Sequence, residues 1–94
     1  MSDGYLDGKR ADIVECDREL MDLLRKRLDL AMEIGKYKAE HGLPALDPEV
    51  ERQVIERYRR LASERGMDPD VAERICRSIM DESVASEEAI ISKR

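Results

Sequence analysis

The 94-residue sequence contains no phenylalanine, no tryptophan and only three tyrosines, so any hydrophobic core must be built from aliphatic side chains. Glycine and proline are also scarce, at five and three residues, whereas 41% of the residues are charged. Such an aliphatic, highly charged composition with few helix-breaking residues is typical of helical proteins. We therefore expect one all-α domain over residues 1–94, without β-strands.

Several features that would indicate other classes of function are missing. Cys16 and Cys76 have no His or Cys partner at metal-ligand spacing, so we expect reduced thiols and neither a metal nor a cofactor. No apolar run reaches 18 residues and no apolar signal segment begins the chain, which predicts a cytoplasmic protein without membrane contact. A net charge of −5 disfavours nucleic-acid binding, and we interpret the RYRR run at residues 57–60 as a solvated helix face.

The hydrophobic periodicity predicts three helices, over residues 6–41, 48–65 and 69–91, after a frayed terminus at residues 1–5. Gly42 suits the left-handed position that ends the first helix. Asp47 and Asp68 each precede a proline, a combination that favours an Asp cap and a Pro in the first helical position of the next two helices.

The first helix is too long for its own chain to enclose. About 35 helical residues extend over roughly 50 Å, whereas a compact domain of this size has a diameter of about 30–35 Å. Its apolar positions, which include Ile13, Leu20 and Leu28, therefore need a partner. We expect an oligomer.

Two cations in this helix are placed to bind a small molecule with two negative charges. Arg27 and Lys38 are eleven residues apart, so they project from one face, separated by about 16 Å along the axis. Arg10 lies about 25 Å before Arg27 and is turned by roughly 100°, so it cannot reach the same ligand from the same straight helix. If Arg10 contributes to a site, it does so in a partner's site.

Two further polar pairs have helical i, i+4 spacing: Asp47 with Glu51, and Ser83 with Glu87. Each pair has a purely structural alternative, because Asp47 also suits a helix cap, Glu51 a first-turn acid, and Ser83 and Glu87 solvated positions. No catalytic triad, metal cluster or phosphate-binding loop accompanies them. The remaining candidate is a binding site in which two cations, Arg27 and Lys38, form a cationic clamp beside these hydrogen-bonding groups.

Taken in order, these residues resemble the all-helical AroQ class of chorismate mutases, over about residues 6–91. The elements that carry the resemblance are Arg10 with Ile13 and Asp17, Leu23-Leu24 with Arg27, Ala31 with Ile34-Gly35 and Lys38, Pro44 with Asp47 and Glu51, and Asp81-Glu82-Ser83 with Glu87. The resemblance implies an intertwined homodimer of three-helix chains with a very long first helix. It also implies a stand-alone, cofactor-independent enzyme that converts chorismate to prephenate for phenylalanine and tyrosine biosynthesis.

The resemblance assigns substrate binding to Arg10, Arg27, Lys38, Asp47, Glu51, Ser83 and Glu87. Arg27 and the partner's Arg10 are expected to bind the two carboxylates of chorismate, for which the planar guanidinium is well suited. Glu51 is expected to take the ring hydroxyl, helped by free helix-end amides near Asp47. Ser83 is expected to support a carboxylate.

By the same resemblance, Lys38, Glu87 and Arg27 are the catalytic residues. Lys38 and Glu87 would flank the ether oxygen, on which negative charge develops as the C–O bond breaks. Lys38 can always donate a hydrogen bond there, whereas Glu87 can donate only when it is protonated. We therefore expect Glu87 to keep its proton in the complex, and activity to fall as pH rises.

One position departs from the family pattern. Many members have Asp-x-x-Arg-Glu at the start of the second helix, where this chain has Val50 between Asp47 and Glu51. The departure puts one substrate contact in doubt and leaves Arg10, Arg27 and Lys38 in place.

Two alternatives remain open. An isochorismate-pyruvate lyase would share the fold and the cationic clamp, although the Asp47 and Glu51 pair favours the mutase because it would serve the ring hydroxyl of chorismate. A non-catalytic, dimeric helical module with a regulatory role would keep the fold alone, and Val50 is a point in its favour.

Overall fold

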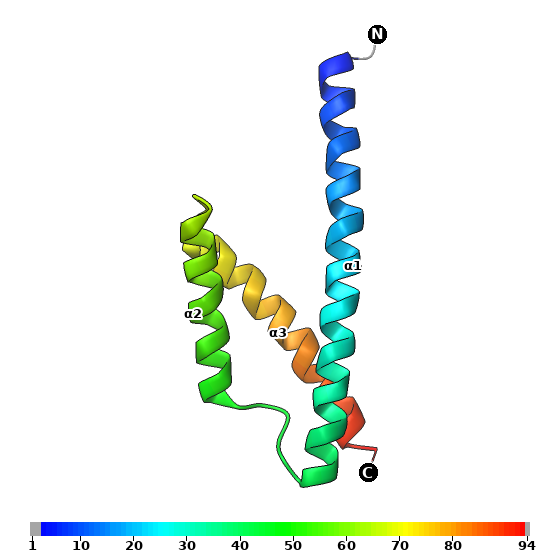
Figure 1. Ribbon diagram of the computed structural model, residues 1–94, viewed down its shortest axis with the longest axis vertical. Coiled ribbons are helices and arrows are strands. Elements are labelled where there is room, and N and C mark those ends of the chain that lie inside the picture. Colours follow the sequence, from blue (N-terminus) through cyan, green and yellow to red (C-terminus); the bar gives the residue numbers. More distant parts are fainter. Residues whose placement is uncertain (1–2, 94) are drawn as a thin grey trace.

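A computed structural model describes residues 3–93 and contains three helices in this range: α1 (Gly4–His41), α2 (Pro48–Glu64) and α3 (Pro69–Ile91). No strand is present among these residues, so the all-α class is confirmed. Figure 1 shows α1 as a long straight helix. The helix α3 runs diagonally from the C-terminal end of α2 to the lower half of α1.

The start of α1 differs from the sequence-based expectation. The frayed terminus was expected to include residues 1–5, of which residues 1–2 lie outside the described range, but α1 already begins at Gly4. The reason is an N-cap at Asp3, whose Oδ1 accepts hydrogen bonds from the backbone N–H groups of Tyr5 at 3.0 Å and Leu6 at 3.2 Å.

The other helix ends follow the predicted chemistry. Asp47 and Asp68 are the N-caps of α2 and α3, and each accepts backbone hydrogen bonds through its carboxylate. Gly42 ends α1 with φ of 67°, in the left-handed region that favours glycine. The α2 helix ends at Glu64, one residue before the expected boundary.

The helix α3 is the only element that packs against both others, because α1 and α2 do not contact each other. The buried residues of the three helices are mostly small: Ala31, Gly35 and Ala39 in α1, Ala62 in α2, and Ala72, Cys76, Met80, Ser83 and Glu87 in α3. Small side chains allow α1 and α3 to approach closely. Two polar residues in this buried set, Ser83 and Glu87, need an explanation, because burial of polar groups is costly.

The first half of α1 is not covered by the rest of the chain. Every residue from 3 to 23 is exposed, including Ile13, Leu20 and Leu23, whose side chains are 56–63% exposed. The radius of gyration is 17.2 Å, whereas a compact chain of this length would have about 12 Å. The chain therefore leaves part of its long helix without a partner, as its length predicted.

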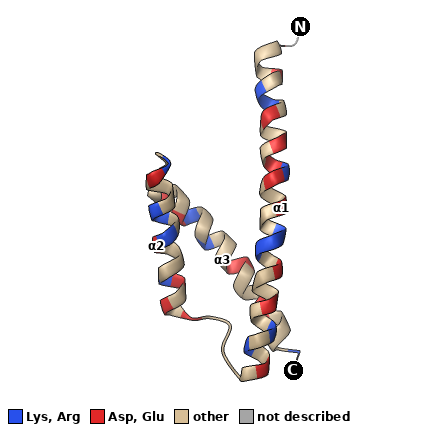
Figure 2. Cartoon of the chain, viewed as in Figure 1, with Lys and Arg blue, Asp and Glu red and all other residues tan. Residues whose placement is uncertain are grey.

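Charges of both signs are mixed along the molecule. Figure 2 shows Lys and Arg interspersed with Asp and Glu along the helices. Among residues 3–93, no helix is long and apolar enough to cross a membrane.

We predict that Gly35→Ala lowers the free energy of unfolding by about 1–3 kcal/mol, the usual cost of overpacking. A Cβ at Gly35 would lie only 3.0 Å from Cα of Glu87, so α1 and α3 would have to move apart. Gly8→Ala is the matched control, because a Cβ there meets nothing within 4 Å, and it should stabilise α1 by roughly 0.5–1 kcal/mol. Urea unfolding of the three proteins tests this, and equal stability of the two variants would contradict the tight contact.

Candidate active site

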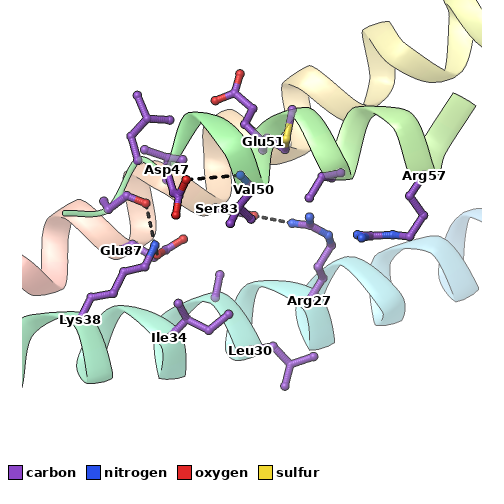
Figure 3. Close-up of a pocket in the computed structure, with 16 residues that line it drawn as sticks. Arg27, Leu30, Ile34, Lys38, Asp47, Val50, Glu51, Arg57, Ser83 and Glu87 are labelled. Atoms are coloured by element: carbon purple, nitrogen blue, oxygen red, sulfur yellow. Dashed lines mark hydrogen bonds and ion pairs between the residues drawn. The ribbon is translucent and has the colours of Figure 1, made fainter. Parts of the chain in front are cut away.

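A cavity of about 500 Å³ opens between α1 and α2, with residues of α3 also in its wall. Its size is within the range of small-molecule sites. Six of the seven site residues expected from the sequence line this cavity: Arg27, Lys38, Asp47, Glu51, Ser83 and Glu87. Figure 3 shows that they come from all three helices.

Lys38 and Glu87 form a largely buried ion pair at one end of the cavity. Nζ of Lys38 lies 2.8 Å from Oε1 of Glu87, and the two side chains are 19% and 9% exposed. The same ammonium donates a hydrogen bond of 2.7 Å to the backbone carbonyl of Ala45. Oε1 of Glu87 has no hydrogen bond of good geometry among residues 3–93, so the contact with Lys38 is electrostatic. A carboxylate is therefore buried with one cation and with unused hydrogen-bonding capacity.

Arg27 and Ser83 interact at the other end. Nη1 of Arg27 donates a hydrogen bond of 2.5 Å to Oγ of Ser83, which itself donates to the carbonyl of Ile79 at 3.1 Å. Arg27 has no carboxylate within ion-pair distance among residues 3–93. Most of its hydrogen-bonding capacity is thus free for an anionic ligand.

Asp47 acts as a helix cap. Its Oδ1 accepts from the backbone N–H groups of Glu49 at 3.1 Å and Val50 at 3.3 Å, and Figure 3 shows the contact to Val50. The expectation that helix-end amides near Asp47 are free for a ligand is wrong for these two groups, because the cap already uses them.

Glu51 lines the cavity, but Figure 3 shows its carboxylate pointing away from Arg27 and Lys38. Oε1 of Glu51 lies 4.0 Å from Nη1 of Arg77 on α3. Arg77 is held in turn by Glu73, whose Oε2 accepts from Nε at 3.1 Å and from Nη2 at 2.8 Å. The hydrogen bonds from Arg77 lower the pKa of Glu73, and those to Glu73 raise the pKa of Arg77.

One charged cavity residue was not predicted as a site residue. Arg57 lines the cavity from α2 and is exposed, so the interpretation of its RYRR run as a solvated face holds for its exposure but missed its place beside the cavity. A signal was available, because Val50, Val54 and Arg57 have the i, i+4, i+7 spacing of one helix face and all three line the cavity.

Arg10 is exposed in the first part of α1 and does not line the cavity of its own chain. Its role in a partner's site stays a prediction. Cys16 and Cys76 are both free, and burial raises the pKa of the Cys76 thiol, although Arg27 and Arg57 act to lower it. No group of three or more His, Cys, Asp or Glu side chains within residues 3–93 is placed to hold a metal ion.

We predict that Lys38→Met lowers the free energy of unfolding at pH 7 by about 3 kcal/mol, because it leaves the Glu87 carboxylate buried without a cation. The double variant Lys38→Met, Glu87→Gln should recover most of this loss, since the remaining amide is neutral. Lys36→Met, at an exposed position of α1, is the control and should change little. If urea unfolding finds the double variant as unstable as the single one, the loss comes from the bond to Ala45 or from packing.

Comparison with known proteins finds several relatives of this chain. The chain is 41% identical over 78 residues to a T-protein of Enterobacter agglomerans, across 83% of this chain but 21% of that protein. It is 31% identical over 84 residues to a 4-amino-4-deoxychorismate mutase of Streptomyces venezuelae, across 89% and 82% of the two chains. A chorismate mutase of Methanocaldococcus jannaschii is 29% identical over 76 residues, across 81% and 77%. The chain thus spans about a fifth of the length of the T-protein and most of the other two.

The model of the family described as chorismate mutase type II matches residues 9–88, which include all seven of the expected site residues. By this match, the chain belongs to the type II chorismate mutase family.

Proposed function

We propose that this protein is a chorismate mutase, which rearranges chorismate to prephenate for the synthesis of phenylalanine and tyrosine. The observation that carries the proposal is one cavity to which α1 contributes Arg27 and Lys38 and α3 contributes Ser83 and Glu87, with α2 forming the opposite wall. Family membership and the names of the relatives agree with it. Two free thiols suit a reducing compartment, and we place the enzyme in the cytoplasm.

The reaction is intramolecular, so the protein must mainly hold the substrate in a reactive conformer. One C–O bond breaks and one C–C bond forms within the same molecule, without any external reactant. Arg27, anchored on Ser83, would fix one carboxylate at one end of the cavity, and Lys38 would contact the substrate at the other end. Holding both ends restricts the substrate to a compact shape with its reacting carbons together.

Stabilisation of the transition state is the task of Lys38 and Glu87. Negative charge gathers on the ether oxygen as the C–O bond breaks, and donors already in place favour this state over the ground state. Lys38 would turn from Glu87 and Ala45 toward this oxygen. A protonated Glu87 would then donate a second hydrogen bond to the same oxygen.

We also propose a homodimer in which each chain supplies Arg10 to the partner's cavity. The exposed apolar residues in the first half of α1 support a second chain there. The position of Arg10 far from its own cavity supports its use by the partner. With the partner's Arg10, each cavity would gain a second guanidinium for the substrate carboxylates.

A second candidate is the same rearrangement of 4-amino-4-deoxychorismate, the substrate in the names of two relatives from Streptomyces. Asp47 and Glu51 line the cavity beside Val50, which adds no positive charge there. Such a lining would accept a ring ammonium as well as a ring hydroxyl. Glu51 would have to turn from Arg77 into the cavity in either case.

The first experiment is turnover of chorismate by the purified protein, with products identified by chromatography. Prephenate is the expected product, and isochorismate and 4-amino-4-deoxychorismate are supplied in parallel. Salicylate and pyruvate from isochorismate would identify the lyase, and a preference for the amino compound would identify the second candidate. If none of the three compounds is consumed, the non-catalytic helical module is the correct interpretation.

We predict that prephenate forms faster at pH 5 than at pH 8, because only a protonated Glu87 donates to the ether oxygen. Because the protonated form of Glu87 is the active one, activity should be highest at low pH and fall as the carboxyl group loses its proton. Glu87→Gln, a neutral donor at every pH, should flatten this profile. A variant that is inactive throughout the range, or a wild type with equal rates at both pH values, would remove the proton-donor role.

The dimer proposal predicts complementation between two inactive variants. Arg10→Ala and Lys38→Ala chains are unfolded together in equal amounts and refolded, so that about half of the dimers are mixed. In a mixed dimer, the chain with intact Lys38 receives an intact Arg10 from its partner, which restores one of its two sites. We expect roughly a quarter of the wild-type activity in the mixture. If Arg10 served its own chain, no site would be restored and the mixture would stay inactive.

A further inference from the structure

Two guanidinium groups face each other in the cavity without a carboxylate between them. Figure 3 shows Arg27 reaching from α1 and Arg57 reaching from α2, with their planar heads pointing toward one another. Both residues line the same cavity, from opposite walls. Only the Arg27 head has a hydrogen-bond partner within residues 3–93, the neutral hydroxyl of Ser83.

Six arginines form ion pairs with acidic neighbours: Arg18, Arg25, Arg52, Arg59, Arg65 and Arg77. Within residues 3–93, Arg10, Arg60 and Arg74 have no ion pair either, but they do not line the cavity. Across the described part of the chain, neither Arg27 nor Arg57 has a carboxylate within ion-pair distance. Like charges that converge in a cavity repel one another, and an anion between them removes that repulsion.

We propose that Arg57 and Arg27 together bind one carboxylate of the substrate, which makes Arg57 a further substrate-binding residue. The inference rests on the proposed function, because the carboxylate belongs to the chorismate-like substrate of this cavity. Two planar forks from opposite helices match the two oxygens of one carboxylate. The ligand then bridges α1 and α2, which do not contact each other directly.

The position of Arg57 also compensates for the missing positive charge at the position of Val50. Both residues lie on the cavity face of α2, and Arg57 follows Val50 by two helical turns. The cation that many family members carry at the position of Val50 is absent here, and Arg57 supplies a positive charge from further along the same face.

Steady-state kinetics with chorismate tests the proposal on the full protein. For Arg57→Gln we expect a KM about tenfold higher with kcat changed less than about threefold, the pattern of lost uniform binding. Arg57→Lys keeps the positive charge but loses the bidentate guanidinium, so its KM should lie between those of the wild type and Arg57→Gln. Arg60→Gln is the matched control, because Arg60 is exposed on the same helix and does not line the cavity. Added salt should raise the KM of the wild type more than that of Arg57→Gln.

Several results would overturn the inference. A KM of Arg57→Gln within about twofold of the wild type would do so. An equal rise in the KM of Arg60→Gln would also do so, because it would show a nonspecific electrostatic effect of the positive charges on α2. If sedimentation shows that Arg57→Gln dissociates the protein, and a high protein concentration restores the KM, Arg57 holds an interface instead. If Arg57→Gln fails to fold, Arg57→Lys carries the test, and a KM equal to that of the wild type overturns the inference. A wild type without turnover would overturn the proposed function itself, which separates that failure from this one.

Discussion

The cavity depends on how closely α1 approaches α3 at Gly35. Because this residue has no side chain, the backbone of Glu87 can lie where a Cβ would otherwise be, only 3.0 Å away. Lys38 follows one turn after Gly35 on the same helix, so the contact also brings its ammonium to the Glu87 carboxyl group. A single glycine in α1 thus sets the position of two groups on which the proposed chemistry depends.

The charge balance of the cavity explains why these positions matter. Arg27, Lys38 and Arg57 line it together with three carboxylates, those of Asp47, Glu51 and Glu87. A formally neutral cavity would bind a dianion poorly, since the substrate would lose hydration without gaining net charge compensation. Protonation of Glu87 and the partner's Arg10 would each shift the balance toward positive charge. The proton and the second chain would therefore act on binding as well as on the chemical step.

The two remaining carboxylates are already partly compensated. The Asp47 oxygen accepts two backbone hydrogen bonds at the positive end of the α2 helix, which offset its charge. Glu51 lies 4.0 Å from Arg77, whose guanidinium is outside the cavity lining. An incoming anion would thus meet less negative charge than the number of carboxylates suggests.

The sequence predicted those parts of the structure that depend on local chemistry. Caps at Asp47 and Asp68 are decided by a few neighbouring residues, and helical spacing alone placed Arg27 and Lys38 on one face. The ion pair between Glu51 and Arg77 could not be predicted in this way, because it depends on how α2 is rotated against α3. Arg57 was missed although its spacing from Val50 and Val54 places it on their helix face, because spacing alone does not say that this face borders the cavity.

The length of α1 links assembly to function in the proposed enzyme. The chain would keep its contact between α1 and α3, and its own cavity from Arg27 to Lys38, if α1 began near residue 24. The preceding residues add nothing to that cavity, and they lack the tertiary packing that supplies most helical stability in proteins. A partner that covers Ile13 and Leu20 would therefore stabilise this half of the helix, and the same contact would deliver Arg10 to the partner's cavity. Formation of the dimer would then both stabilise the first half of α1 and complete the site.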